Sequence, residues 1–235
     1  MRKAKPIESS EAQKATAEVL LDTAERLFAR DGIENVSIRQ IVIHSGHGNQ
    51  SGAHYHFGTR ETLIRMLLER RMETTDAFRH EELDRLVESG QDHDVYAITQ
   101  AGVRVLERVV KEFSWGRDYV IVAAQALFSP RLHLFTTLSA QAITGLERAS
   151  SMTRAALPHL SAACVSERLQ MFRRHGTYEI ARWLQENEFN DSTQKSFESM
   201  IQNLCEFSSA GIAAPSRSMD PLSKPSPKRR RALNP

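Results

Sequence analysis

The sequence has few cysteines, no long apolar run and no secretion signal, and each absence narrows the possible class of protein. Its two cysteines, Cys164 and Cys205, lie far apart and outside any spacing typical of a metal site. Two such thiols indicate a reducing compartment. No apolar run approaches the roughly 18 residues of a membrane span, and the basic start MRKAKPIESS lacks the apolar core of a signal peptide. We therefore expect a cytoplasmic protein without membrane contact.

The motifs of common catalytic sites are also missing. There is no Ser-His-Asp constellation, no G-x-S-x-G and no phosphate-binding loop. Four histidines fall within thirteen residues, at His44, His47, His54 and His56. A metal site needs three or four converging ligands, whereas these straddle a helix end or point to different helix faces. We expect no metal, no other cofactor and no enzymatic activity.

Apolar residues follow helical spacing almost throughout, and strand signals and internal repeats are absent. The sequence therefore predicts an all-α fold. We expect a first helix from Ser9 or Ser10 to Arg30, ended by Asp31-Gly32, and a long helix capped by Thr59 that continues toward Leu86. Further helices are expected near 94–114, 117–128, 131–156, 161–187 and 191–211, the third with Pro130 in its first turn.

Charge is unevenly distributed along a chain of ordinary globular composition, 40% hydrophobic and 26% charged. Residues 1–71 hold 11 Lys/Arg and 9 Asp/Glu, residues 72–214 hold 14 and 19, and residues 215–235 hold 6 and 1. An acidic body between basic ends favours nucleic-acid contact through a limited surface rather than diffuse coating.

The stretch Ser37–Glu61 predicts two short helices joined by a tight turn. Ser37 can cap the first helix, which ends near His44. Ser45-Gly46-His47-Gly48 supplies the glycines that a sharp turn requires. The second helix is expected from Asn49 or Ser51 to Phe57, with polar, small and aromatic side chains outward. This arrangement is typical of a helix-turn-helix that reads DNA.

Five segments occur in a fixed order at the start of the chain. They are Leu27-Phe28, Asp31-Gly32, Ser37-Ile38-Arg39-Gln40-Ile41, Tyr55-His56-Phe57 and Gly58-Thr59-Arg60-Glu61-Thr62-Leu63. In these segments the first 71 or so residues resemble the N-terminal domain of the TetR family of transcriptional repressors, and the rest of the chain resembles that family only in length and helicity. The turn and recognition helix together carry about one residue more than the common form, and the helix is similar to that of a subgroup with an Asn-x-Ser type helix.

The resemblance implies four regions in the chain. They are a disordered arm at 1–8, a three-helix DNA-binding domain at 9–71, a helical effector-binding and dimerisation domain at 72–212, and a disordered basic tail at 213–235. The acidic middle and the Pro-, Ser- and Arg-rich end of the sequence agree with the last two assignments.

DNA contacts are assigned by role from the same resemblance. Arg39 and Arg60 would bind phosphates, as would Tyr55, whereas Gln50 and its neighbours would face base edges. Some of these side chains, Tyr55 in particular, could instead pack inside the small domain. The full set of candidates is Ser37, Arg39, Gln50, Ser51, Gly52, His54, Tyr55, His56, Thr59 and Arg60.

The remaining candidates concern a dimer interface and an effector pocket. The last two helices are amphipathic, and the resemblance implies that they pack against a second copy, although they could simply cover a monomer core. The interface candidates are Val165, Leu169, Phe172, Ile180, Trp183, Leu184, Phe197, Ile201 and Leu204. The pocket candidates, each of which could also be core, are Trp115, Phe128, His133, Phe135, Met152, Phe172 and Tyr178.

We therefore expect a homodimeric transcriptional regulator that binds a palindromic double-stranded operator. It would be a repressor released by a small-molecule ligand of unspecified chemistry. The alternative is a helical small-molecule-binding or interaction protein whose helix-turn-helix is vestigial.

Overall fold

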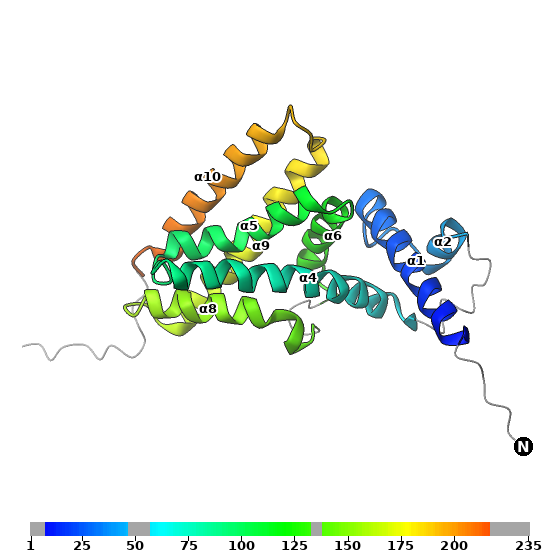
Figure 1. Cartoon of the computed structure of the whole chain (residues 1–235), viewed down its shortest axis with the longest axis horizontal. Coiled ribbons are helices and arrows are strands. Elements are labelled where there is room, and N and C mark those ends of the chain that lie inside the picture. Colours follow the sequence, from blue (N-terminus) through cyan, green and yellow to red (C-terminus); the bar gives the residue numbers. More distant parts are fainter. Residues whose placement is uncertain (1–7, 47–56, 133–137, 217–235) are drawn as a thin grey trace, which may run out of the picture.

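The computed structural model describes residues 8–46, 57–132 and 138–216, with side chains from residue 14 onward, and every regular element in these ranges is a helix. This confirms the all-α prediction (Figure 1). The elements are α1 (Glu8–Asp31), α2 (Ile38–His44), α4 (Arg60–Glu88), α5 (Val95–Glu112), α6 (Gly116–Phe128), the 3-10 turn η1 (Ala140–Ile143), α8 (Thr144–Ala156), α9 (Ala162–Glu186) and α10 (Gln194–Ala213).

Helix ends follow the capping residues that the sequence supplies. Ser37 and Gln40 form a reciprocal capping box at the start of α2, where the Ser37 hydroxyl accepts from the backbone N–H of Gln40 and the Gln40 side chain accepts from that of Ser37. Thr59 accepts from the N–H of Thr62 at the start of α4. Gly32 follows α1 with φ of +93°. These caps were predicted and are confirmed.

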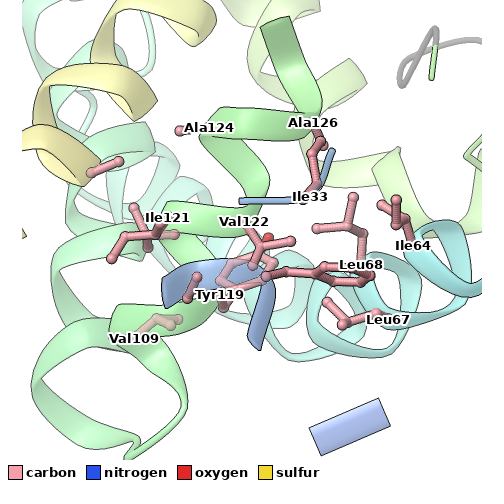
Figure 2. Packing of buried hydrophobic residues seen from close by; sticks show 14 of the residues in the cluster. Ile33, Ile64, Leu67, Leu68, Val109, Tyr119, Ile121, Val122, Ala124 and Ala126 are labelled. Carbon is pink, nitrogen blue, oxygen red and sulfur yellow. The ribbon is translucent and has the colours of Figure 1, made fainter. Parts of the chain in front are cut away.

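The first two helices pack against α6 and the first half of α4 through a continuous apolar cluster. Figure 2 shows Tyr119 and Val122 of α6 beside Leu67 and Leu68 of α4, with Ile33 from the start of the α1–α2 connection against the same group. All five side chains are buried. Such burial stabilises each by about 1.5–3 kcal/mol relative to exposure, so the N-terminal helices are held by the body itself.

The long helix α4 joins the N-terminal helices to the body. Leu63 and Ile64 of its first turns belong to the core around α1 and α2, and Leu83 is buried five turns later. Figure 1 shows α4 crossing the body beside α5 and α8. The expected domain boundary at residues 71 and 72 therefore falls inside an unbroken helix, so the two regions cannot separate without bending it.

One expected helix is shorter than predicted. The segment from 131 was expected to be helical with Pro130 in its first turn, but Pro130 lies in a turn and regular helix begins only at Ala140. Carboxylates of the N-terminal region hold both ends of this connection. Ser129 donates its hydroxyl to Glu34 (3.1 Å), and the Ser139 backbone N–H donates to Glu69 (3.0 Å). Residues 133–137 lie outside the described ranges.

None of the helices in the described part of the chain is long and apolar enough to span a bilayer.

Candidate functional site

An apolar cavity of about 130 Å³ lies in the body, where α4, α5, α6, α8 and α9 meet. An internal space of roughly 150 Å³ in an apolar protein core is known to accommodate benzene, so this one has room for a ring or a short chain. Its apolar lining includes Leu68, Met72, Val103, Leu106, Phe172 and Ile180. A space of this kind is the usual setting for a small-molecule site.

Arg79 brings a charge into this apolar lining. Its side chain is only 8% exposed, and its Nη1 donates to Asp76 Oδ1 at 2.8 Å. Its Nε is buried and has no hydrogen-bond partner among the described residues. Burial lowers the pKa of Arg79, and the neighbouring Tyr119 and Asp76 oppose that shift. A buried donor without an acceptor is costly, which makes Arg79 a candidate ligand contact.

Asp76 accepts hydrogen bonds from the start of α8 as well as from Arg79, so it neutralises Arg79 only in part. Both of its oxygens accept from the backbone N–H of Gly145 (3.1 and 3.0 Å), and Oδ2 accepts from the Thr144 hydroxyl at 2.7 Å. Thr144 and Gly145 open α8, whose own N-cap position provides no side-chain bond. Asp76 of α4 thus caps α8, where the helix dipole favours a negative charge.

Gly145 permits this close approach. A Cβ at that position would lie 2.9 Å from Asp76 Oδ1 and 3.2 Å from Cβ and Cδ of Arg79. The glycine is therefore required for the carboxylate and the arginine to sit against the start of α8.

Arg173 of α9 is the second cation in the lining. Its Nη2 donates to the Ser150 hydroxyl at 2.6 Å and to the Leu146 carbonyl at 3.4 Å, which are neutral acceptors on α8. Burial lowers the pKa of Arg173, and the nearby cations Arg79 and Arg154 lower it further. The described lining contains two arginines and no carboxylate.

Most hydroxyl groups in the lining donate their hydrogen bond to a backbone carbonyl of the protein. Thr99 donates to the Val95 carbonyl, Ser150 to that of Leu146, and Thr153 to that of Ala149. These groups retain lone pairs and offer no proton to a ligand. The hydrogen-bond donors that the cavity can present to a ligand therefore come chiefly from its arginines.

The aromatic residues predicted for the pocket are mostly elsewhere. Phe172 lines the cavity, as expected, whereas Phe128 and Tyr178 stack edge-to-face on the surface (ring centroids 5.7 Å apart) and Met152 is half-buried on α8 outside the lining. Trp115 lies under the guanidinium of Arg71, 4.2 Å from Cζ to the ring centroid. His133 and Phe135 lie outside the described residues.

Arg79 and Arg173 are not among the residues predicted from the sequence. A signal was present in α4, where Met72, Asp76, Arg79 and Leu83 recur at helical spacing on one face. Charged residues on the buried face of a helix must find partners. The pattern therefore indicates that Asp76 and Arg79 lie in the core.

A second charged cluster ties α1 to α4 two turns earlier. Glu25 of α1 is 2% exposed and receives both Nε and Nη2 of Arg71, the latter at 2.6 Å. Arg70 donates to Glu18 and Asp22 and lies 3.6 Å from Glu25. Burial raises the pKa of Glu25, and the arginines oppose that shift. Here every charge has an opposite partner.

The described DNA candidates differ in what holds them. Ser37 and Thr59 are occupied as helix caps, as given above. Arg39 is exposed and forms no ion pair or hydrogen bond with the described residues. Arg60 lies 3.4 Å from Glu34, and its Nε and Nη2 are buried without hydrogen-bond partners. The other candidates, Gln50, Ser51, Gly52, His54, Tyr55 and His56, lie outside the described residues, as does the helix expected from Asn49 or Ser51 to Phe57 except for Phe57 itself.

The predicted dimer residues face the core of their own protomer. Phe172 is half-buried beside the cavity, and the other eight, Val165, Leu169, Ile180, Trp183, Leu184, Phe197, Ile201 and Leu204, are buried. These side chains are therefore covered by other parts of the same protomer, as in the alternative that α9 and α10 cover a monomer core. Packing of the two helices against a second copy stays a prediction.

Exposed apolar side chains lie on the opposite faces of the same helices. Met171 and Tyr178 of α9 are 67% and 46% exposed, and Phe207 of α10 is 70% exposed. The Phe207 ring contacts His175, with centroids 5.6 Å apart. Figure 1 shows α10 on the outer side of the body, away from α1 and α2. We call Met171, His175, Tyr178 and Phe207 the outer face.

No protein-family model matches this chain, and no curated protein matches it in sequence.

Proposed function

We propose that this protein is a transcriptional regulator of the TetR type, which binds operator DNA through its N-terminal helices and a small molecule in the body cavity. The observation that carries the proposal is the course of α4. The helix begins at Thr59, beside the segment with the helix-turn-helix pattern, and later supplies Leu68, Met72 and Arg79 to the cavity. A ligand that favours one position of α4 would thereby bias the N-terminal helices.

A second connection supports the same coupling. Tyr119 and Ala123 of α6 line the cavity. Gln125, on the same helix, accepts from the Ile33 N–H at 2.8 Å and donates to the Phe28 carbonyl at 3.3 Å. Displacement of α6 by a ligand would therefore act directly on the end of α1. Two rigid elements run from the cavity to the N-terminal helices.

DNA contact is assigned to Arg39, which is exposed and has no competing partner in the described structure. Arg60 contributes through a partly buried guanidinium that shares Glu34 with Arg131 (3.8 Å). We also propose that two copies associate through the outer face, because reading a palindrome requires two heads related by a two-fold axis.

The proposal is tested by titrating the full chain with DNA that flanks its own gene, at two salt concentrations and with random competitor. Arg39→Ala should weaken specific binding and reduce the slope of log K against log salt by about 0.9 for each arginine removed. Arg85→Ala is the matched control, because Arg85 is 59% exposed near the other end of α4. Equal effects of the two variants would remove Arg39 from the interface.

The same titration separates the two candidate functions. Equal affinity for flanking and random DNA, lost at the higher salt concentration, would favour a helical small-molecule-binding protein with a vestigial helix-turn-helix. The cavity supports that second candidate by itself. Saturable binding that survives the competitor would support the regulator.

A further inference from the structure

The charges around the cavity are unbalanced toward the positive. Arg79 and Arg173 both line it, and Asp76 is the carboxylate that reaches Arg79. That carboxylate also accepts from Thr144 and Gly145 at the start of α8, so its charge is shared with a helix N-terminus, which itself carries about half a positive charge. The described lining thus holds two cations and no carboxylate, beside the positive start of α8.

The lining of this space also contains a buried donor without an acceptor. Arg79 is nine-tenths buried, and its Nε has no acceptor among the described residues. Most hydroxyls of the lining offer only lone pairs, as shown above for Thr99, Ser150 and Thr153. A ligand that only donates hydrogen bonds would leave Arg79 Nε unsatisfied. A ligand with a negatively charged acceptor would satisfy it and would add a charge-assisted hydrogen bond to Arg173.

We propose that the cavity binds a small amphipathic carboxylate, with its apolar body among Leu68, Val103, Leu106 and Phe172 and its carboxylate toward Arg79 and Arg173. The volume of about 130 Å³ has room for an apolar body the size of a benzene ring, because a cavity of roughly 150 Å³ holds benzene. The planar guanidinium fork binds a carboxylate with two parallel hydrogen bonds.

This inference deepens the proposed function by giving the effector a chemical class, and it rests on the cavity being the effector site. Its test uses the full chain without DNA, so a failure to bind DNA leaves the result unchanged. The probes are phenylacetate and phenylacetamide, which have the same shape and differ in charge. Their affinities are measured by isothermal titration calorimetry for the wild-type chain and for two single variants.

Arg173→Met is the decisive variant, and Arg174→Met is its control. Arg174 is the next residue of α9 and is exposed, so its loss removes a positive charge without entering the lining. We expect wild type to bind phenylacetate at least about tenfold more tightly than the amide, as expected for a hydrogen bond to a charged group. Arg173→Met should abolish that preference, and Arg174→Met should retain it.

Arg79→Met gives a second readout at the other cation, with thermal unfolding used to confirm that each variant is folded. If Arg79→Met fails to fold because Asp76 loses its partner, Arg173→Met decides alone. Equal affinity of wild type for acid and amide would overturn the proposal. A preference that survives both substitutions, or no heat at millimolar phenylacetate or octanoate with folded protein, would overturn it as well.

Discussion

Two charged clusters lie on α4, two turns apart, and they differ in how completely their charges are matched. Around Arg70 and Arg71, the acids Glu18, Asp22 and Glu25 of α1 provide an acceptor for each guanidinium. Around Arg79, one carboxylate serves a cation and a helix start, and a second cation lies on α9. We call the first cluster closed because each of its charges has an opposite partner, and the second open because the cavity lining beside it holds two arginines and no carboxylate. Both Arg70 Nε and Arg79 Nε are buried without a hydrogen-bond partner among the described residues.

The difference separates two uses of buried charge. A closed cluster fixes geometry, because any movement of α1 against α4 would uncover a charge. An open cluster retains positive charge that an anionic ligand can balance, and it occurs where the structure also leaves space. Helix α4 therefore carries both a closed cluster that fixes the N-terminal helices and an open cluster that is a candidate ligand contact.

The largest expected effect comes from opening the closed cluster with Arg71→Met. Glu25 would keep only Arg70, 3.6 Å away, while remaining 2% exposed. The free energy of unfolding should fall by about 3 kcal/mol at pH 7, as for other buried pairs that lose one partner. Arg85→Met, which removes a 59% exposed side chain, should cost about 0.5 kcal/mol or less. Urea unfolding at equilibrium measures both.

The same variant has a signed pH dependence. Burial already raises the pKa of Glu25 above its unfolded value, and loss of Arg71 would raise it further. A carboxyl whose pKa is higher in the folded state favours folding when protonated, and that contribution is lost as pH rises through the folded pKa. The deficit of Arg71→Met should therefore shrink as pH falls from 7 toward 4.5. A deficit that grows on acidification would contradict this account.

A smaller effect is expected from disturbing the open cluster with Gly145→Ala. The new methyl would lie 2.9 Å from Asp76 Oδ1, so the cap on α8 and the position of Arg79 must shift. Unfolding should become easier by about 2 kcal/mol, as for other overpacked sites. Gly102→Ala is the control, since its methyl would meet only Phe172 at 3.8 Å. Equal stability of the two variants would show that the cap tolerates displacement.

Much of the fold could be predicted because its signals are local. Ser37, Thr59 and Gly32 mark helix ends through their own backbone bonds, and apolar spacing gave most helices to within a few residues. The connection after Phe128 could not be predicted, because Glu34 and Glu69 hold it from distant parts of the chain.

The candidate site was harder to predict, since it is made by tertiary pairing. Asp76, Gly145 and Arg173 are up to 97 residues apart in the sequence and come from three helices. The burial of Trp183 and Phe197 was expected from their spacing, but an amphipathic stripe does not say whether it meets its own core or a second copy. Whether such a stripe packs inside its own protomer depends on how many apolar faces the other helices present to it.

Association through the outer face can be broken with Phe207→Ser. Phe207 is 70% exposed in the protomer, so its replacement should leave the free energy of unfolding of the protomer nearly unchanged while weakening self-association about tenfold or more. Sedimentation velocity over a range of concentrations measures the shift. Val87→Ser, on an exposed turn of α4, should leave sedimentation unchanged. A monomeric wild-type chain, or equal behaviour of both variants, would contradict the outer face.

A connection between the two regions can be weakened with Gln125→Met. The side chain bonds the Ile33 N–H and the Phe28 carbonyl, and its loss should lower the free energy of unfolding by about 1 kcal/mol. Gln185→Met, at an exposed position of α9, should have no measurable effect. If α6 transmits ligand binding, Gln125→Met should also reduce the effect of phenylacetate on operator affinity. If phenylacetate changed the operator affinity of this variant as much as that of wild type, α4 alone would transmit ligand binding.

The smallest effect is expected at a cation that lies near the open cluster without entering the cavity. Arg148 of α8 pairs with Asp84 at 2.7 Å, and the two side chains are 31% and 60% exposed. Arg148→Met should change the free energy of unfolding by about 0.5 kcal/mol or less, because solvent screens such a pair, and it should leave phenylacetate affinity unaltered. Urea unfolding and calorimetry give the two values. A loss of affinity as large as that of Arg173→Met would mean that the positive potential of the whole region attracts the anion, and that the buried donors of the lining do not select it.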